Sequence, residues 1–156
     1  MESYLGPGEP RSGAELPVPL QEIQTLLGDS LRGILLFGSA ARGEERQSSD
    51  IDLLIVVETS LPLTRSLYGL WDRGIEGASG SAISPHFVHL PDSEGKLGSL
   101  WYEAAIEGIV LYERDACISK LLRRVRRSMA EGKVQRKSAY GHPYWVRSGE
   151  ETTDVQ

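Results

Sequence analysis

Two short apolar runs, separated by a glycine turn and a polar loop, are the features that most limit the folds open to this chain. The first run, residues 31–37, ends at Gly38-Ser39, and the second, residues 51–57, is rich in branched aliphatic residues. Runs of this length and composition, bounded by turn residues, are typical of buried strands. The order therefore predicts a strand, a tight turn that opens a short helix at Ala40, a polar loop, and a central strand.

The remaining segments alternate in the same way. Apolar spacing predicts helices over 20–27, 61–75, 96–107 and 115–131, with Gly28 and Gly132 as stop signals, and strands over 82–90 and 108–112. Pro85 favours an edge position for the third strand, because proline cannot donate to a strand ladder. This order predicts an α/β (α+β) fold with one small mixed sheet covered by helices.

Length and composition favour one folded domain with two tails. We expect a flexible N-terminal arm over 1–16, a domain over 17–132, and an aromatic and basic extension over 133–156. With a single cysteine among 156 residues, no internal disulfide framework can form, and a cytoplasmic location fits. No run approaches the length needed to cross a bilayer, so we expect no membrane role. A net charge of -5 argues against a surface that clamps nucleic acid throughout.

A pair of carboxylates marks the start of the second apolar run. Asp50 and Asp52 are two residues apart, and strand side chains alternate, so both carboxylates are expected on the same face. Magnesium prefers oxygen ligands and fills its other positions with water or substrate phosphates. The spacing therefore predicts a metal site at Asp50 and Asp52. Taken alone, such a pair is more often two solvated carboxylates.

The turn after the first run has the features of a phosphate site. Gly38 and Ser39 lie between a strand and a helix, where backbone amides and a hydroxyl can surround a phosphate. Arg42 lies one helical turn later and can pair with phosphate oxygens, although a lone arginine is more often a surface charge. In combination with the aspartates, these residues predict a nucleotide site.

The segments 36–43 and 49–56 closely resemble the signature of the polymerase-beta-like nucleotidyltransferase superfamily, especially its minimal nucleotidyltransferases. The resemblance implies metal-dependent transfer of a nucleoside monophosphate, with ATP as the expected donor, to a hydroxyl, with release of pyrophosphate. It implies that Gly38, Ser39, Arg42 and Ser49 bind the nucleotide, and that Asp50 and Asp52 bind Mg²⁺. Such proteins often act as antitoxins that adenylylate a tyrosine of a HEPN-type toxin, so we expect a protein partner of this kind.

The third apolar strand departs from this pattern. Family enzymes commonly carry a third carboxylate there, but residues 83–90 contain neither Asp nor Glu. His86 aligns with the missing acid and can act as a base, so it is our third catalytic candidate, although a partly buried structural imidazole is the more common case for it and for His89. Glu58 and Asp92 are the remaining nearby acids, and both are expected to be exposed. Because this acid is missing, an alternative function stays open, in which the chain is a non-catalytic module that neutralises a partner by binding it.

The C-terminal third of the chain is basic and then aromatic. Residues 120–137 hold eight basic residues and one acid, Glu131, while apolar residues recur at helical spacing. A packed helix with a solvated basic face is favoured, although this face can also meet RNA, an acidic protein or substrate phosphates. Tyr140, Tyr144 and Trp145 can stack a base, anchor an interface or fold back as a lid.

Besides transfer to a protein and binding without catalysis, transfer of the nucleotide to a small molecule or to tRNA is a third possible function.

Overall fold

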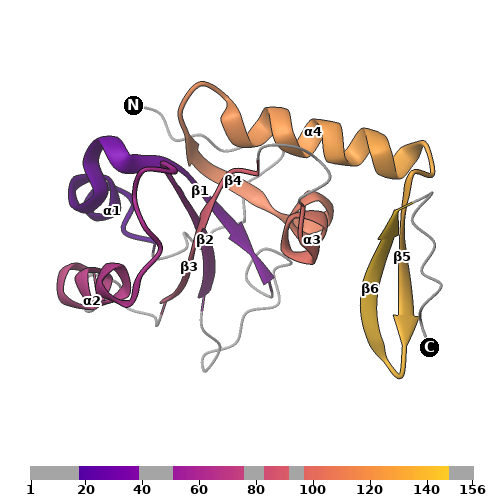
Figure 1. Ribbon diagram of the computed structural model, residues 1–156. Coiled ribbons are helices and arrows are strands. Elements are labelled where there is room, and N and C mark those ends of the chain that lie inside the picture. Colours follow the sequence, from indigo (N-terminus) through magenta and orange to yellow (C-terminus); the bar gives the residue numbers. More distant parts are fainter. Residues whose placement is uncertain (1–17, 39–50, 76–82, 92–96, 148–156) are drawn as a thin grey trace, which may run out of the picture. The chain divides into compact units, whose positions relative to one another are not determined.

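The computed structural model describes residues 18–38, 51–75, 83–91 and 97–147 (Figure 1). Along the chain the elements are α1 (Leu20–Leu27), a 3-10 turn η1 (Gly28–Ser30), β1 (Leu31–Phe37), β2 (Ile51–Val57), α2 (Arg65–Gly74), β3 (Ile83–His89), α3 (Ser99–Glu107), β4 (Ile109–Glu113), α4 (Cys117–Ala130), β5 (Val134–Ala139) and β6 (His142–Arg147). No helix among these residues is long and apolar enough to cross a membrane.

The chain divides into two compact units. The first comprises residues 1–90 and 107–118, and the second comprises residues 91–106 and 119–156. The first unit therefore contains the sheet with α1 and α2, and the second contains most of α3 and α4 and the β5–β6 hairpin.

The sheet of the first unit is mixed, as the sequence predicts. Its strand order is β3-β2-β1-β4, with β2 parallel to β3 and β1 antiparallel to both of its neighbours. The bounds of β1 and β2 coincide with the two apolar runs, because Gly38 ends the first and branched residues fill the second. The expected helix at Ala40 lies outside the described residues.

Alternation along the strands builds the core of this unit. Alternate residues of β1 and β2, such as Leu36 and Leu53, pack in one cluster with Ile23 of α1 and Trp71 of α2. These four side chains are at most 3% exposed. Burying each one contributes on the order of 1.5–3 kcal/mol before entropy is counted, so the central strands are held firmly in place.

Pro85 lies on the edge strand β3, as its chemistry requires. The backbone N–H of Phe87 donates to the Tyr68 hydroxyl at 3.2 Å, so this N–H points away from β2. Pro85 is two residues earlier and shares that outer side, where its missing N–H leaves no ladder bond unmade. The outer edge of β3 is thus partly covered at Phe87 and lacks a donor at Pro85.

Helix α2 begins at Arg65 and not at Leu61, so the predicted start was wrong. Pro62 disfavours helical geometry at the residue before it, and the backbone N–H of Leu61 instead donates to the Glu58 carbonyl at 2.9 Å. Thr64 N–H then donates to the Pro62 carbonyl at 3.1 Å, which makes a second turn before the helix. Proline therefore delays the helix by one turn.

The second unit contains a β-hairpin where the sequence indicated only a turn-rich aromatic segment. Strands β5 and β6 pair antiparallel around the two-residue loop Tyr140-Gly141. Trp145 stacks on Tyr102 of α3 with ring centroids 5.0 Å apart, and its indole N–H donates to Glu103 at 3.0 Å. The segment thus folds back within its own unit, and one face of the hairpin packs on α3.

Helix α4 is amphipathic, in agreement with the sequence. Leu121, Leu122 and Val125 are buried, while Lys120 and Arg123 are exposed. The helix ends at Ala130, and the predicted stop residue Gly132 has the positive φ of +76° that favours glycine after a helix.

Candidate active site

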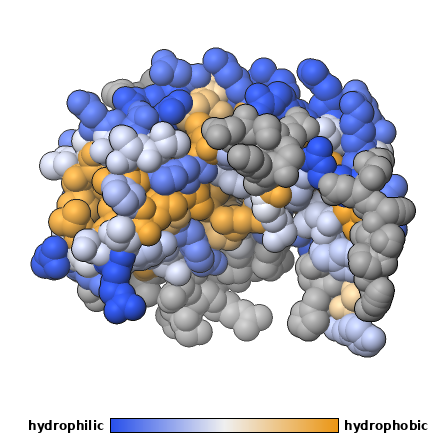
Figure 2. All heavy atoms as spheres, viewed as in Figure 1, coloured by the Kyte–Doolittle hydropathy of each residue, from blue (hydrophilic) through white to orange (hydrophobic). Residues whose placement is uncertain are grey.

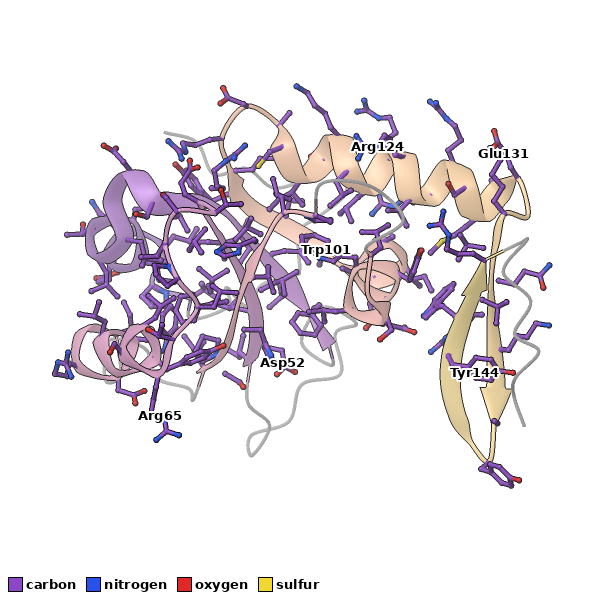
Figure 3. The ribbon with its side chains drawn as sticks, in the orientation of Figure 1. Asp52, Arg65, Trp101, Arg124, Glu131 and Tyr144 are labelled. Atoms are coloured by element: carbon purple, nitrogen blue, oxygen red, sulfur yellow. The ribbon has the colours of Figure 1, made fainter. Side chains whose placement is uncertain are left out.

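The turn after β1 lies directly against the first carboxylate of β2. Phe37 is the register partner of Asp52, so Gly38 follows at the point where the two strands end together (Figure 3). A β-carbon on Gly38 would stand 2.6 Å from Asp52 Oδ2, and Gly38 has a φ of +82°. Both the collision and the left-handed backbone exclude other residues here. The sequence predicts that Gly38 lies close to a phosphate, and in the structure the group close to Gly38 is the Asp52 carboxylate.

His86 reaches the same carboxylate from the neighbouring strand. The parallel register pairs Asp52 with Ser84, and His86 is two residues further along the same face of β3. His86 Nε2 lies 3.6 Å from Asp52 Oδ1, which is too long for a direct hydrogen bond. The imidazole edge also meets the Phe37 ring at a centroid distance of 5.4 Å. The structure therefore brings two of the three predicted catalytic residues together.

This pair is open to solvent and to a ligand. The side chains of His86 and Asp52 are 43% and 34% exposed. Among the described residues, no lysine or arginine pairs with Asp52, and no three His, Cys, Asp or Glu side chains are grouped closely enough to hold a metal ion. Asp52 thus offers one accessible carboxylate, which suits a hard cation that takes its other ligands elsewhere.

The other predicted site residues, Ser39, Arg42, Ser49 and Asp50, lie outside the described residues. Gly38 and Ile51 are the last and first described residues on either side of that segment. Its two ends, at Gly38 and next to Asp52, are therefore close together in space. The nucleotide-binding assignments, and the assignment of Asp50 and Asp52 as metal ligands, remain predictions from the sequence.

Glu58 does not belong to this site. It accepts a hydrogen bond from Arg114 Nη2 at 3.0 Å, and Arg32 Nε lies 3.9 Å from the same oxygen. Six residues of strand separate Glu58 from Asp52, or about 20 Å. The side chain of Glu58 is 37% exposed, so this acid is partly exposed and is also ion-paired. Asp92 lies outside the described residues.

The two histidines of β3 have different surroundings. His89 Nε2 lies 2.8 Å from the Leu61 carbonyl oxygen, so His89 has the backbone partner expected of a structural histidine. His86 instead contacts a carboxylate and an aromatic ring. The structural interpretation is confirmed for His89, whereas His86 faces Asp52.

Sequence reasoning missed two neighbours of the site. Phe37 supports the His86 ring, and Ser84 is the register partner of Asp52. The available signals were the position of Phe37 directly before Gly38 and the spacing of two residues between Ser84 and His86. Neither signal identifies a contact until the strand register is known.

Comparison with known proteins identifies the family of this chain. A family model described as polymerase beta nucleotidyltransferase matches residues 21–116, which is more than half of the chain and includes Gly38, Asp52 and His86. Spectinomycin 9-adenylyltransferase from Staphylococcus aureus is 51% identical over 55 residues, which cover 31% of this chain and 21% of that enzyme. A protein of Methanocaldococcus jannaschii, provisionally named a protein adenylyltransferase, is 47% identical over 38 residues, covering 24% of this chain and 38% of the relative.

One similar solved structure is a mutant of the toxin-antitoxin MntA-HpeT. It superposes with a TM-score of 0.51 at 18% identity, covering 74% of this chain and 90% of that chain. At this identity the likeness concerns the fold alone, and it agrees with a mixed sheet flanked by helices. The sequence match and the fold lead to one conclusion: the chain belongs to the polymerase beta nucleotidyltransferase family.

Proposed function

We propose that this protein is a metal-dependent nucleotidyltransferase that transfers AMP from ATP to a hydroxyl group of a partner protein. The observation that carries the proposal is the contact of the Gly38 turn with the Asp52 carboxylate. In a member of this family, that contact joins a turn suited to phosphates to a carboxylate suited to a cation.

Asp52 and Asp50 are the residues that would hold Mg²⁺. Asp52 fits this role because its carboxylate is accessible and has no lysine or arginine partner among the described residues. Alternation along a strand would place Asp50 on the same face. When bound, the ion would neutralise phosphate charge and orient the triphosphate for in-line attack. In this proposal Gly38, Ser39, Arg42 and Ser49 bind the nucleotide.

The transfer itself exchanges one phosphorus–oxygen bond for another. The acceptor oxygen bonds to the α-phosphorus, the bond to the bridging oxygen breaks, and pyrophosphate leaves with that electron pair. The acceptor proton must pass to a base or to water. His86 is the proposed group for holding the acceptor hydroxyl and taking its proton, because its Nε2 lies 3.6 Å from Asp52.

A tyrosine of a HEPN-type toxin is the proposed acceptor, with this protein as its antitoxin. The minimal nucleotidyltransferases that the sequence resembles supply the argument for this acceptor. The archaeal relative provisionally named a protein adenylyltransferase supports a protein acceptor. We further propose that the reaction takes place in the cytoplasm, where the single thiol would stay reduced.

The test is incubation with Mg²⁺ and ATP, with and without the protein partner that co-purifies with this chain, followed by intact mass of each chain. We expect AMP on the partner. The variant Asp50→Asn/Asp52→Asn should lose this addition, while the control Asp72→Asn/Asp115→Asn should keep it. Asp72 and Asp115 are exposed and carry the same change of charge. Normal transfer by a folded Asp50→Asn/Asp52→Asn variant would refute the site.

A second candidate function is a binding module without catalysis. It is favoured by β3, where His86 faces Asp52 and no Asp or Glu is present between residues 83 and 90. A stable complex with the partner and nucleotide binding, but no added AMP under any condition, would support this function and reject the transferase.

Transfer to a small molecule is a third candidate, and the segment shared with spectinomycin 9-adenylyltransferase favours it. That segment spans 21% of the enzyme, so most of the enzyme has no counterpart in the match. Parallel incubations with spectinomycin and with tRNA in place of the protein partner distinguish these acceptors. AMP found only on one of them would replace the protein acceptor in the proposal.

A further inference from the structure

Charge is unevenly divided between the two units. The described residues of the second unit include nine basic side chains and only two acidic ones, Glu103 and Glu131. Those of the first unit include eight acidic and four basic side chains. Over its full sequence the second unit has ten basic and seven acidic residues, and its positive charge is concentrated in residues 119–147, which hold nine basic residues and one acid, Glu131. Most of this unit lies beyond residue 116, where the family match ends.

One stripe of α4 carries much of this positive charge. Lys120, Arg123 and Arg127 are exposed and recur three and four residues apart, so they share a helix face. The stripe extends about 10 Å along the helix. Figure 2 shows hydrophilic residues in a row over α4. Arg126 differs, because its Nε donates to the Ala105 carbonyl at 2.7 Å and holds α4 to α3.

The hairpin adds aromatic side chains to a basic surface. Its inner face packs on α3 through Trp145 and Arg136, which lies 3.2 Å from Glu103. Strand side chains alternate, so Lys137 and its partner Tyr144 lie on the other face. Lys137 is exposed, and Tyr144 is 44% exposed. A cation and an aromatic ring thus lie side by side, and packing on α3 does not use them.

Tyr140 at the tip of the hairpin is the least expected residue of this unit. It is 100% exposed and has a φ of +53°, in a loop position that Asn, Asp or Gly normally fills. A bulky side chain at positive φ is strained, and at full exposure this one gains no compensating contact from the described residues. A large aromatic residue held here in solvent indicates a ligand that stacks on it.

We infer that the second unit binds single-stranded RNA. The α4 stripe supplies cations for the phosphates, and Tyr140 and Tyr144 supply rings on which unpaired bases stack. An acidic protein surface would need only the cations, and a duplex leaves no base face free for the tyrosines. The Tyr140 hydroxyl and the amide of exposed Gln135 can also pair with 2′-hydroxyl groups, which favours RNA over DNA.

The test is fluorescence anisotropy of the full chain with a labelled single-stranded RNA of mixed sequence over a series of salt concentrations. The variant Arg123→Gln/Arg127→Gln should flatten the slope of log affinity against log salt by about 1.4, since each phosphate contact on a single strand contributes about 0.7. The control Arg65→Gln/Arg73→Gln removes the same charge from exposed residues of α2 and should leave binding unchanged.

Variants of the two tyrosines distinguish binding of RNA from binding of other polyanions. Tyr140→Ala and Tyr144→Ala should each weaken RNA binding about tenfold, which corresponds to the loss of one stacked base, while Tyr144→Phe should retain binding. The inference is overturned by any of four results: no RNA binding at low salt, equal loss in the α2 control, no effect of either alanine variant, or equal competition by single-stranded DNA, duplex RNA or poly-glutamate.

Discussion

The backbone of Gly38 lies against the carboxylate of Asp52, so closely that a β-carbon would stand 2.6 Å from Oδ2. Gly38→Ala should therefore displace Asp52 and also strain a backbone with φ of +82°. The strain alone costs about 1–2 kcal/mol. We expect a larger loss of unfolding free energy than this, together with loss of nucleotide binding, as measured by urea denaturation and by titration with ATP.

Gly132→Ala is the matched control. Gly132 also has positive φ, at +76°, but a β-carbon there meets no atom within 4 Å. This variant should show the strain cost without loss of nucleotide binding. Equal effects of the two substitutions would mean that contact with Asp52 does not matter.

His86 can be tested by restoring the acid that the family commonly carries. His86→Ala should reduce the rate of AMP transfer by about 100-fold or more, the usual range for a group that handles a proton. His86→Asp should retain more activity than His86→Ala, because a carboxylate on this face of β3 again points toward Asp52. Rates follow from intact mass of the acceptor over time.

His89→Ala serves as the comparison, since His89 bonds to the Leu61 carbonyl and not to the site. It should lower stability and leave the rate per folded molecule unchanged. If the wild type transfers nothing and His86→Asp does, the missing carboxylate is what separates a binding module from an enzyme.

Glu58 and Arg114 should contribute to stability and not to transfer. Arg114 Nη2 donates both to Glu58 and to the Asp29 carbonyl, each at 3.0 Å, and so ties β2 to the segments beside β1 and β4. Arg114→Ala should cost about 1 kcal/mol, since it removes one exposed and one part-buried hydrogen bond from a side chain that is 36% exposed. Arg73→Ala, on exposed α2, should cost little. A fall in transfer rate for folded Glu58→Gln would contradict this separation.

The sequence predicts the strands of the site well and its contacts less well. The bounds of β1 and β2 follow from apolar runs that end at Gly38 and begin after Asp50, because local chemistry decides them. The distance between His86 and Asp52 depends on the parallel register of β2 and β3, which is set by packing between segments far apart in the chain. Resemblance to the family suggested His86, but strand patterning alone could not.

The hairpin was missed for a related reason. Gln135 and Lys137 of β5 are exposed and polar, and Tyr140-Gly141 is not a typical hairpin turn sequence. Its stability comes from contacts of Trp145 with Tyr102 and Glu103, more than 40 positions earlier in the chain. Such long-range packing overrides a weak local preference.

Cys117 gives a prediction about pH. Burial raises the pKa of the Cys117 thiol above the usual 9.0, although Arg32 acts in the opposite direction. The folded chain thus holds this proton more tightly than the unfolded chain, and stability should fall as pH rises from the unfolded pKa through the folded one. Below neutral pH the thiol has no effect on stability, because both states are protonated.

Thiol reactivity measures this shift directly. Cys117 is the single cysteine, so a disulfide reagent reports on it alone. At pH 8 the folded chain should react more slowly than the chain in urea, since less thiolate is present and the thiol lies 3.6 Å from the Arg32 carbonyl. Equal rates at pH 8 would show that the folded thiol is neither shielded nor shifted.

Trp145 should hold the hairpin to α3. Trp145→Ala removes the stack on Tyr102 and the hydrogen bond to Glu103, at a cost of about 1–3 kcal/mol, a value typical of a part-buried hydrogen bond together with an aromatic pair. We expect faster amide hydrogen exchange over residues 134–147, and little change in β1 and β2, which belong to the other unit. Tyr144→Ala, on the opposite hairpin face, should leave exchange nearly unchanged.

Because Glu103 also meets Arg136, Glu103→Gln should weaken the same attachment, and its effect should be less than additive with Trp145→Ala. Additive effects would mean that the indole and the carboxylate hold the hairpin independently.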